Sequence, residues 1–408
     1  MKLISKKYHV SDIVTAALFI ILPFWTVPLA IFQFIKTRRV FYASLISFFF
    51  GLTASLLAPT GDLYRLYIVY FDFQDSSFQD FLNYIEIKPD FLFYLLLYTF
   101  AKLGLSIRLI IFAIVFSYFQ LSFKLLLKQV TAVSAGVIIL FVMQFDFLLQ
   151  GLFLRFPMAM LIVIYAFLRN LEGRKYVLIW LIIASMVHFA ALITIPLFFL
   201  SKMRLKKLNI LFLISLFLMP FGSYIFIFLT THLLDYFPEI PLKLKIESYF
   251  LGYWALEYFD DRTWKALLQF YTERLLYVFV LLYFLLTKNS NKYRLQVIPF
   301  LILINILFSF PNLFSRYSTL AIFFGLYTMI IEQRKSAISR FIKFAVILIL
   351  PVVFGIRIVA QQKNIRAGYI PQVLYTNVMS LSFKKYDKQW IQKNIDKETA
   401  RPKNIESL

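Results

Sequence analysis

The sequence contains no cysteine, which excludes disulfide bonds, thiolate nucleophiles, zinc–thiolate sites and iron–sulfur clusters. Histidine is almost as scarce. His9, His188 and His232 are the three, and their scatter along the chain argues against a histidine-ligated metal centre. Charged residues make up 16% of the chain, whereas a soluble domain carries about 25%. These shortages exclude most thiol and metal chemistry and indicate a solvent other than water.

Apolar residues fill 61% of the 408 positions, phenylalanine alone accounts for 49 of them, and the mean hydropathy is +0.76. Such a chain would expose too much apolar surface in water, so most of it is predicted to lie in lipid. We expect an all-α, polytopic integral membrane protein with about 11–14 transmembrane helices. No repeat or low-complexity linker divides the sequence. Residues 1–360 are therefore interpreted as one membrane domain and residues 361–408 as a basic polar tail.

The formal net charge is +22, and the basic residues stand in short clusters between apolar runs. The clusters Lys202–Lys207, Lys288–Arg294 and Arg334–Lys343 are typical of cytoplasmic loops in a polytopic membrane protein. We therefore favour membrane topology over nucleic-acid binding as the reason for the positive charge.

Apolar runs predict where the chain crosses a hydrocarbon core about 30 Å thick. Pro23 and Pro28 are expected to kink the first run. Basic clusters flank residues 176–200 on both sides, so we expect this run to form a hairpin of two short helices with His188 at the outer apex. The predicted spans are residues 13–35, 40–59, 91–104, 107–127, 132–149, 153–168, 176–200, 208–229, 268–287, 296–310, 314–331 and 341–360.

Two segments, residues 60–90 and 230–265, are polar, rich in aromatic residues and poor in lysine and arginine. Scarcity of these basic residues marks a translocated loop, so we expect both to be extracytoplasmic amphipathic segments. Their aromatic residues fit two interpretations, either anchors at the lipid headgroups or walls of a cleft in which sugar rings stack.

Ionisable groups at membrane depth are costly, so they are candidates for function. Arg155 and Arg316 each stand near the start of a span, where they would bind phosphate or extend to the headgroups. His188 would be a base, a hydrogen-bond donor to substrate, or a neutral side chain satisfied by a backbone carbonyl. Asp62 and Asp90 would either cap the following helices or hold a sugar hydroxyl.

Several of these residues belong to short motifs in a definite order between about residues 60 and 330. The motifs are GDLYRLY from Gly61, KPDFLFYLLLYTF from Lys88, LRFPMA around Arg155, RNLEGRKY from Arg169, SMVHFAALI around His188 and SRYSTLA around Arg316. With these motifs in this order, the chain resembles the EpsG/Wzy-type family of bacterial polysaccharide polymerases. Family members often have Gln after the arginine and Ser soon after the histidine, where this chain has Phe156 and Ala190.

The resemblance implies a GT-C-like, metal-independent glycosyltransferase without cofactor, in a bacterial inner (cytoplasmic) membrane, with its site facing the periplasm or cell exterior. Its substrate would be an oligosaccharide linked to undecaprenyl diphosphate. Membrane lipid and a chain-length regulator are the other candidate partners, and no nucleic acid is expected. The implied roles are catalysis for His188 and Asp62, diphosphate binding for Arg155 and Arg316, and weaker glycan contacts for Tyr64, Arg65, Asp90 and Tyr317.

Three other classes stay open. An O-antigen ligase has the same broad architecture, and only motif order separates it from a polymerase. A flippase or secondary transporter commonly uses broken helices and hinge glycines near the midplane, and glycine is only 11 of 408 residues here. A non-enzymatic scaffold would not need arginine and histidine at membrane depth.

Overall fold

A computed structural model describes residues 10–86, 88, 90–129, 144–233, 243, 247, 263–287, 291–332 and 337–403. Helices and the turns between them account for these residues, apart from an isolated bridge between Ile395 and Pro402. The predicted all-α, polytopic membrane class is confirmed. Within the described part of the chain, five apolar helices are long enough to cross a membrane, namely Ile107–Leu125, Leu205–Ile225, Trp264–Leu286, Pro311–Ile331 and Ala337–Ala360.

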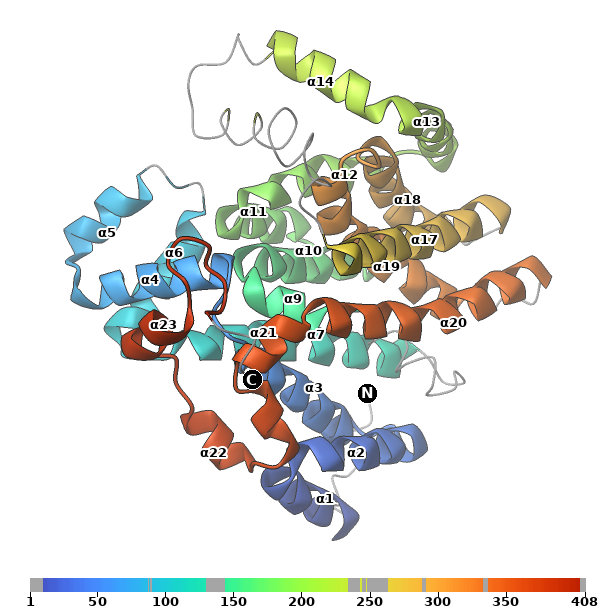
Figure 1. Cartoon of the computed structure of the whole chain (residues 1–408). Coiled ribbons are helices and arrows are strands. Elements are labelled where there is room, and N and C mark those ends of the chain that lie inside the picture. Colours follow the sequence, from blue (N-terminus) through green and yellow to red (C-terminus); the bar gives the residue numbers. More distant parts are fainter. Residues whose placement is uncertain are drawn as a thin grey trace.

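The described helices follow one another as shown in Figure 1. The first half of the chain contains α1 (Val10–Ile21), α2 (Pro23–Thr37), α3 (Val40–Ser55), α4 (Asp62–Asp75), α5 (Phe78–Ile85), α6 (Phe91–Lys102), α7 (Ile107–Gln129), α9 (Phe147–Leu152), α10 (Arg155–Leu171), α11 (Val177–Val187), η1 (Phe189–Ile193) and α12 (Thr194–Leu200). The second half contains α13 (Leu205–Leu218), η2 (Met219–Phe221), α14 (Gly222–Leu233), α17 (Trp264–Leu286), α18 (Asn291–Ile306), α19 (Pro311–Ile331), α20 (Ala337–Ala360), α21 (Gln362–Ala367), η4 (Ile370–Leu374), α22 (Val378–Phe383) and α23 (Lys388–Asn394).

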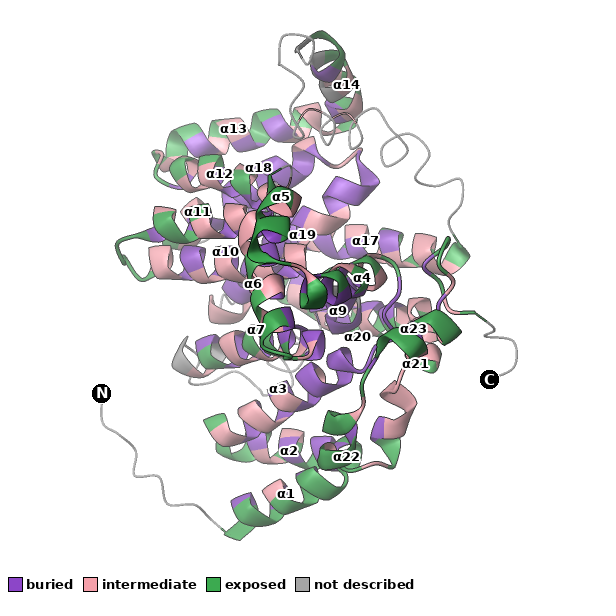
Figure 2. Ribbon diagram, turned by 90° about the vertical axis from the view of Figure 1, so that its left-hand side faces the viewer, coloured by how far each residue is buried: buried purple, intermediate pink, exposed green. Residues whose placement is uncertain are grey.

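The burial pattern agrees with a lipid environment (Figure 2). Helix α19 lies at the centre, with 78% of its span buried, whereas α13 and α20 are mostly uncovered. Their uncovered side chains are large and apolar, for example Phe217 on α13 and Phe341 on α20. A soluble protein rarely exposes apolar surface of this extent, so these helices face lipid.

Proline divides the first predicted span into two helices. Helix α1 ends at Ile21 and α2 begins at Pro23, because proline cannot donate the backbone hydrogen bond that a continuous helix needs there. Pro28 lies inside α2.

The run 176–200 is broken at His188, as predicted. Helix α11 ends one residue earlier, His188 has an extended backbone (φ −151°, ψ 121°), and η1 and α12 follow it. After α12 the Lys202 ammonium donates a hydrogen bond to Asn170 Oδ1 at 2.6 Å, so the chain has returned to the end of α10. The run is therefore a hairpin with His188 at its apex.

Basic residues gather at one end of the bundle, which we call the basic end. Arg294 donates to Asn209 at 3.4 Å, and Asn170 donates to Gln296 at 3.2 Å, so the loops after α10, α12 and α17 meet there. The described basic residues of this end include Arg169, Arg174, Lys202, Arg204, Lys206, Lys207, Lys292 and Arg294.

Part of the two predicted extracytoplasmic segments is described. Residues 60–90 contain α4 and α5, at the left of Figure 1. Helix α5 begins with a capping box, in which hydrogen bonds from the Ser77 hydroxyl and backbone N–H lower the pKa of the Asp80 carboxyl. Most of the segment 230–265, and residues 132–143 of another predicted span, lie outside the described residues.

The residues after 361, interpreted above as a polar tail, form helices that pack against the end of the bundle opposite the basic end (Figure 1). The buried Tyr386 hydroxyl donates to the carbonyl of Leu56 at 2.6 Å. The guanidinium of the buried Arg108 donates to the carbonyl of Leu381 at 3.1 Å. These contacts join the C-terminal helices to α3 and α7.

Candidate active site

A cavity of about 310 Å³ lies at the end of the bundle opposite the basic end. Helices α4, α10, α17 and α19 begin beside it, at Asp62, Arg155, Trp264 and Pro311, and α20 ends there at Ala360. Helix N-termini carry partial positive charge and favour nearby anions. The volume of the cavity is at the lower end of the range for small-ligand pockets, about 300–1,000 Å³.

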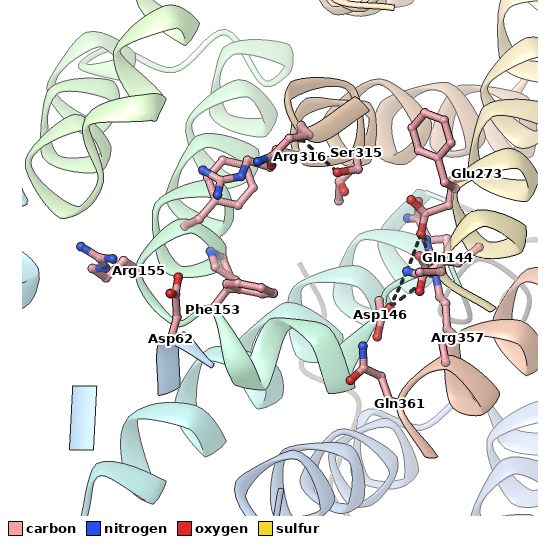
Figure 3. A pocket seen from close by; sticks show the side chains of 18 of the residues that line it. Asp62, Gln144, Asp146, Phe153, Arg155, Glu273, Ser315, Arg316, Arg357 and Gln361 are labelled. Atoms are coloured by element: carbon pink, nitrogen blue, oxygen red, sulfur yellow. Dashed lines mark hydrogen bonds and ion pairs between the residues drawn. The ribbon is translucent and has the colours of Figure 1, made fainter. Parts of the chain in front are cut away.

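Charged side chains occupy two sides of this cavity (Figure 3). Asp62 and Arg155 lie on one side, and Arg316 on α19 lies above them. A second charged group stands on the opposite side and contains Asp146, Glu273 and Arg357.

Four of the predicted site residues line this one cavity, although they are far apart in the sequence. They are Asp62, Arg155, His188 and Arg316. Their chemical roles stay predictions.

Arg155 is held by two side chains from α6 and the residue before it. Its Nη1 donates to Asp90 Oδ2 at 3.0 Å and to the Tyr94 hydroxyl at 3.1 Å. Asp90 is 1% exposed, whereas the Arg155 side chain is 27% exposed. Asp90, predicted as a glycan contact, is therefore placed behind the cavity, where it orients the arginine.

Asp90 also contacts the apex at His188. Its Oδ1 accepts the backbone N–H of Phe189 at 2.9 Å and lies 3.8 Å from His188 Nδ1. Nδ1 of His188 accepts the backbone N–H of Ala190 at 3.2 Å. This hydrogen bond assigns the proton of the neutral ring to Nε2.

Arg316 and Tyr317 contact the same apex from α19. The Arg316 guanidinium lies 5.7 Å from the ring centre of Phe156, in cation–π geometry. The Phe156 ring meets His188 edge-on at 5.7 Å and Tyr317 at 6.0 Å. The Tyr317 hydroxyl donates to the carbonyl of Ala190 at 2.7 Å, so Tyr317 supports the apex from behind the lining.

The motif that begins at Gly61 contributes one residue to the lining. Gly61 has φ +56°, a left-handed conformation that glycine adopts without strain, and α4 begins directly after it. Asp62 faces the cavity, and its carboxylate lies 3.7 Å from Arg65. Arg65, with a side chain 79% exposed, and the half-buried Tyr64 are not among the lining residues.

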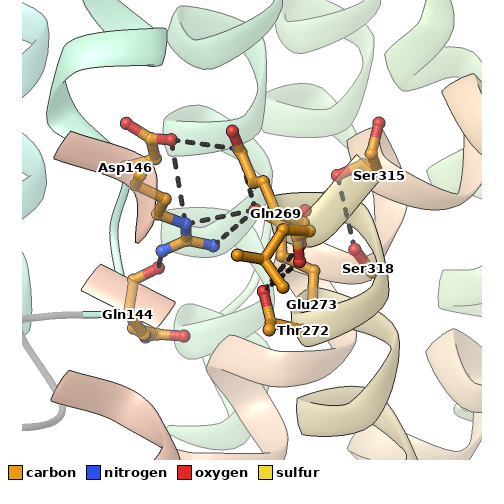
Figure 4. A network of polar contacts seen from close by, with 9 residues as sticks. Gln144, Asp146, Gln269, Thr272, Glu273, Ser315 and Ser318 are labelled. Atoms are coloured by element: carbon orange, nitrogen blue, oxygen red, sulfur yellow. Dashed lines mark hydrogen bonds and ion pairs between the residues drawn. The ribbon is translucent and has the colours of Figure 1, made fainter. Parts of the chain in front are cut away.

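The charged group on the opposite side of the cavity was not predicted from the sequence (Figure 4). Arg357 donates through Nη2 and Nε to the same oxygen of Glu273, Oε1, at 3.0 and 3.1 Å. Its Nε lies 3.7 Å from Asp146 Oδ2, and its Nη1 donates to the carbonyl of Gln144. Gln269 Nε2 donates to both carboxylates, to Glu273 at 3.2 Å and to Asp146 at 3.4 Å.

The sequence did contain a signal for this group. Glu273 and Arg357 stand inside the apolar runs that form α17 and α20. Ionisable groups at membrane depth are costly, so the argument that made His188 a candidate for function applies equally to these two residues. Within the described part of the chain, no group of three or more His, Asp or Glu side chains has an arrangement that would hold a metal ion.

A family sequence model matches most of the chain. The sequence model of the EpsG family matches residues 39–372, a range that includes all eight of the predicted site residues. No curated protein and no solved structure matches the chain.

Proposed function

The chain belongs to the EpsG family, and from this premise we propose that the cavity is the active site of a glycosyltransferase that polymerises polysaccharide. Family membership supports a role in polysaccharide biosynthesis at a membrane. The observation that carries the proposal is the convergence of two arginines, one histidine and one aspartate on one cavity. The proposed substrates are glycan repeat units linked to undecaprenyl diphosphate.

The proposed reaction transfers the growing glycan from its lipid carrier to the next lipid-linked repeat unit. A hydroxyl oxygen of the acceptor sugar forms a bond to the anomeric carbon of the donor. The bond from that carbon to the phosphate oxygen breaks, and its electron pair leaves with undecaprenyl diphosphate. The hydroxyl proton passes to a base.

Arg155 and Arg316 are assigned to the diphosphate, on which negative charge grows as the glycosidic bond breaks. Both described hydrogen-bond partners of Arg155 contact Nη1, so Nε and Nη2 retain donors for phosphate oxygens. The helix N-termini of α4, α10, α17 and α19 add partial positive charge beside the same cavity.

His188 and Asp62 are assigned to the acceptor hydroxyl. Because His188 Nδ1 accepts a backbone N–H, Nε2 carries the proton of the neutral ring and suits a hydrogen-bond donor to substrate. Asp62 is the cavity-lining carboxylate of the first motif, with a side chain 33% exposed, and is proposed to accept the hydroxyl proton.

The cavity is proposed to open on the periplasmic or outer side of the cytoplasmic membrane. Positively charged loops of polytopic proteins stay in the cytoplasm. The basic end of the bundle carries such loops after α10, α12 and α17, and the cavity lies at the other end. Lipid-linked repeat units would thus meet the site after crossing the membrane.

The test is a gel of surface glycan from a deletion strain beside strains complemented with wild type, Arg155→Ala, Arg316→Ala and Arg204→Ala. We expect the wild type and Arg204→Ala to restore the ladder, since Arg204 is exposed at the basic end and does not line the cavity. Deletion, Arg155→Ala and Arg316→Ala should leave a single repeat unit on its anchor. Loss of every unit would indicate a ligase or a flippase instead, and an unchanged ladder would contradict the proposal.

A further inference from the structure

The wall of the cavity opposite Arg155 contains three buried ionisable side chains and two amides. We call it the amide–carboxylate wall; its members are Gln144, Asp146, Gln269, Glu273 and Arg357. The side chains of Asp146, Glu273 and Arg357 are 5%, 10% and 9% exposed.

Resting on the polymerase function proposed above, we infer that this wall binds the hydroxyl groups of the acceptor sugar and so selects the incoming repeat unit. Buried charge inside membrane-spanning helices is costly and usually marks a functional site. The ion pair of Glu273 and Arg357 joins α17 to α20, yet it leaves polar atoms of the wall for a ligand.

Glu273 supplies a hydrogen-bond acceptor. Its Oε1 takes all three of its described hydrogen bonds, two from Arg357 and one from Gln269. None of the described hydrogen bonds or ion pairs of Glu273 uses its other oxygen, Oε2, and Glu273 lines the cavity. The arginine thus fixes the carboxylate while the second oxygen stays available to a hydroxyl.

Gln144 supplies a donor. The residue is 5% exposed, and its amide nitrogen is buried without a hydrogen-bond partner in the described chain. Buried amides without partners are rare, and a ligand oxygen is one way to satisfy them. Gln144 also lines the cavity, and its backbone carbonyl accepts a hydrogen bond from Arg357.

A mixture of donors and acceptors fits hydroxyl groups, each of which donates one hydrogen bond and accepts others. It does not fit a diphosphate, which only accepts and which the carboxylates of Asp146 and Glu273 would repel. The two lining arginines outside this wall, Arg155 and Arg316, suit the diphosphate instead.

The position of the amide–carboxylate wall, across the cavity from Arg155, indicates that the sugar it binds is the acceptor. The donor sugar is bonded directly to the diphosphate, so it must lie beside Arg155 and Arg316. The amide–carboxylate wall faces that sugar from the opposite side (Figure 3), where the attacking hydroxyl approaches. Phe270, one turn before Glu273 on α17, also lines the cavity.

The experiment uses full-length protein in lipid nanodiscs and two probes that divide the substrate. One probe is inorganic pyrophosphate, and the other is the oligosaccharide released by mild acid from the producing strain's lipid-linked repeat unit. Calorimetry measures the affinity of each probe for wild type, Gln144→Leu, Glu273→Gln and Arg155→Ala. Gln120→Leu is the matched control, because Gln120 on α7 also has a buried amide nitrogen without a partner in the described chain but does not line this cavity.

We expect Gln144→Leu and Glu273→Gln to weaken oligosaccharide binding about tenfold and to leave pyrophosphate binding within about twofold of wild type. Arg155→Ala should weaken pyrophosphate binding about tenfold and leave oligosaccharide binding within about twofold of wild type. Gln120→Leu should change neither affinity. Removing an amide without a hydrogen-bond partner does not destabilise the fold. Gln144→Leu therefore tests oligosaccharide binding by the wall even if Glu273→Gln fails to fold.

Oligosaccharide affinity that is equal in wild type and Gln144→Leu, or absent in wild type, would overturn the acceptor subsite. The polymerase proposal would survive that result if wild-type protein still extends lipid-linked glycan in the same nanodiscs. Failure of the wild type to extend glycan would overturn the polymerase and the subsite together.

Discussion

The buried carboxylate of Asp90 binds the Arg155 guanidinium at 3.0 Å with one oxygen and the backbone N–H of Phe189 at 2.9 Å with the other. One side chain therefore joins the start of α10 to the apex of the hairpin that ends α11. Two residues proposed to act on substrate, Arg155 and His188, are positioned by the same group.

Asp90→Asn should destabilise the protein and abolish polymerisation. Breaking a buried ion pair leaves the partner charge unpaired, and we expect a loss of about 3 kcal/mol in the free energy of unfolding, at the low end because Arg155 is partly exposed. Thermal unfolding in detergent measures this effect.

The control is Asp75→Asn, which alters an exposed carboxylate on α4. A double-mutant cycle of Asp90→Ala with Arg155→Ala measures the coupling directly. Additive effects of the two changes would show that the contact contributes nothing.

His188→Asn should preserve the fold and reduce the polymerisation rate by about 100-fold or more. Asparagine is a good N-cap, so its side-chain oxygen can accept the Ala190 N–H that His188 Nδ1 accepts now. The substitution removes Nε2, the proposed donor to substrate. Initial rates with purified lipid-linked repeat units, beside thermal unfolding of the same variant, separate the two effects. A normal rate would show that His188 only shapes the apex.

Tyr386→Phe should lower the free energy of unfolding by about 1 kcal/mol, because the variant loses the buried hydrogen bond to the carbonyl of Leu56. Tyr375→Phe is the matched control, since Tyr375 is 70% exposed on the same C-terminal segment. Thermal unfolding in detergent compares the two variants. Equal stability would mean that this hydrogen bond contributes nothing to the free energy of unfolding.

Single cysteines should report the orientation of the bundle. The chain has no cysteine of its own, so Arg65→Cys and Lys207→Cys each introduce the only thiol. Both positions are exposed, Arg65 at the cavity end and Lys207 at the basic end. We expect a membrane-impermeant maleimide to label Arg65→Cys in intact spheroplasts and Lys207→Cys only after lysis. The opposite pattern would contradict an outward-facing cavity.

Composition and charge alone determined the membrane class and one topological detail. The apolar fraction requires lipid as the main solvent, and this holds whatever the order of the residues. The hairpin at His188 was also predictable, because basic clusters on both sides of one apolar run must stay on the same face of the membrane. The ordered motifs indicated the family that the sequence match then showed.

Only the tertiary structure decided which charges meet. Arg357 and Glu273 are far apart in the sequence, as are Arg155 and Asp90, and helix periodicity does not say which neighbour a helix faces. The residues after 361 have the composition of a polar tail, yet they bury Tyr386 and Ile391 against other helices. Solvent preference is a property of each residue and can be read along the chain. A pair or a cavity depends on how several helices pack in three dimensions, because each partner stabilises the other only where packing brings them within a few ångströms.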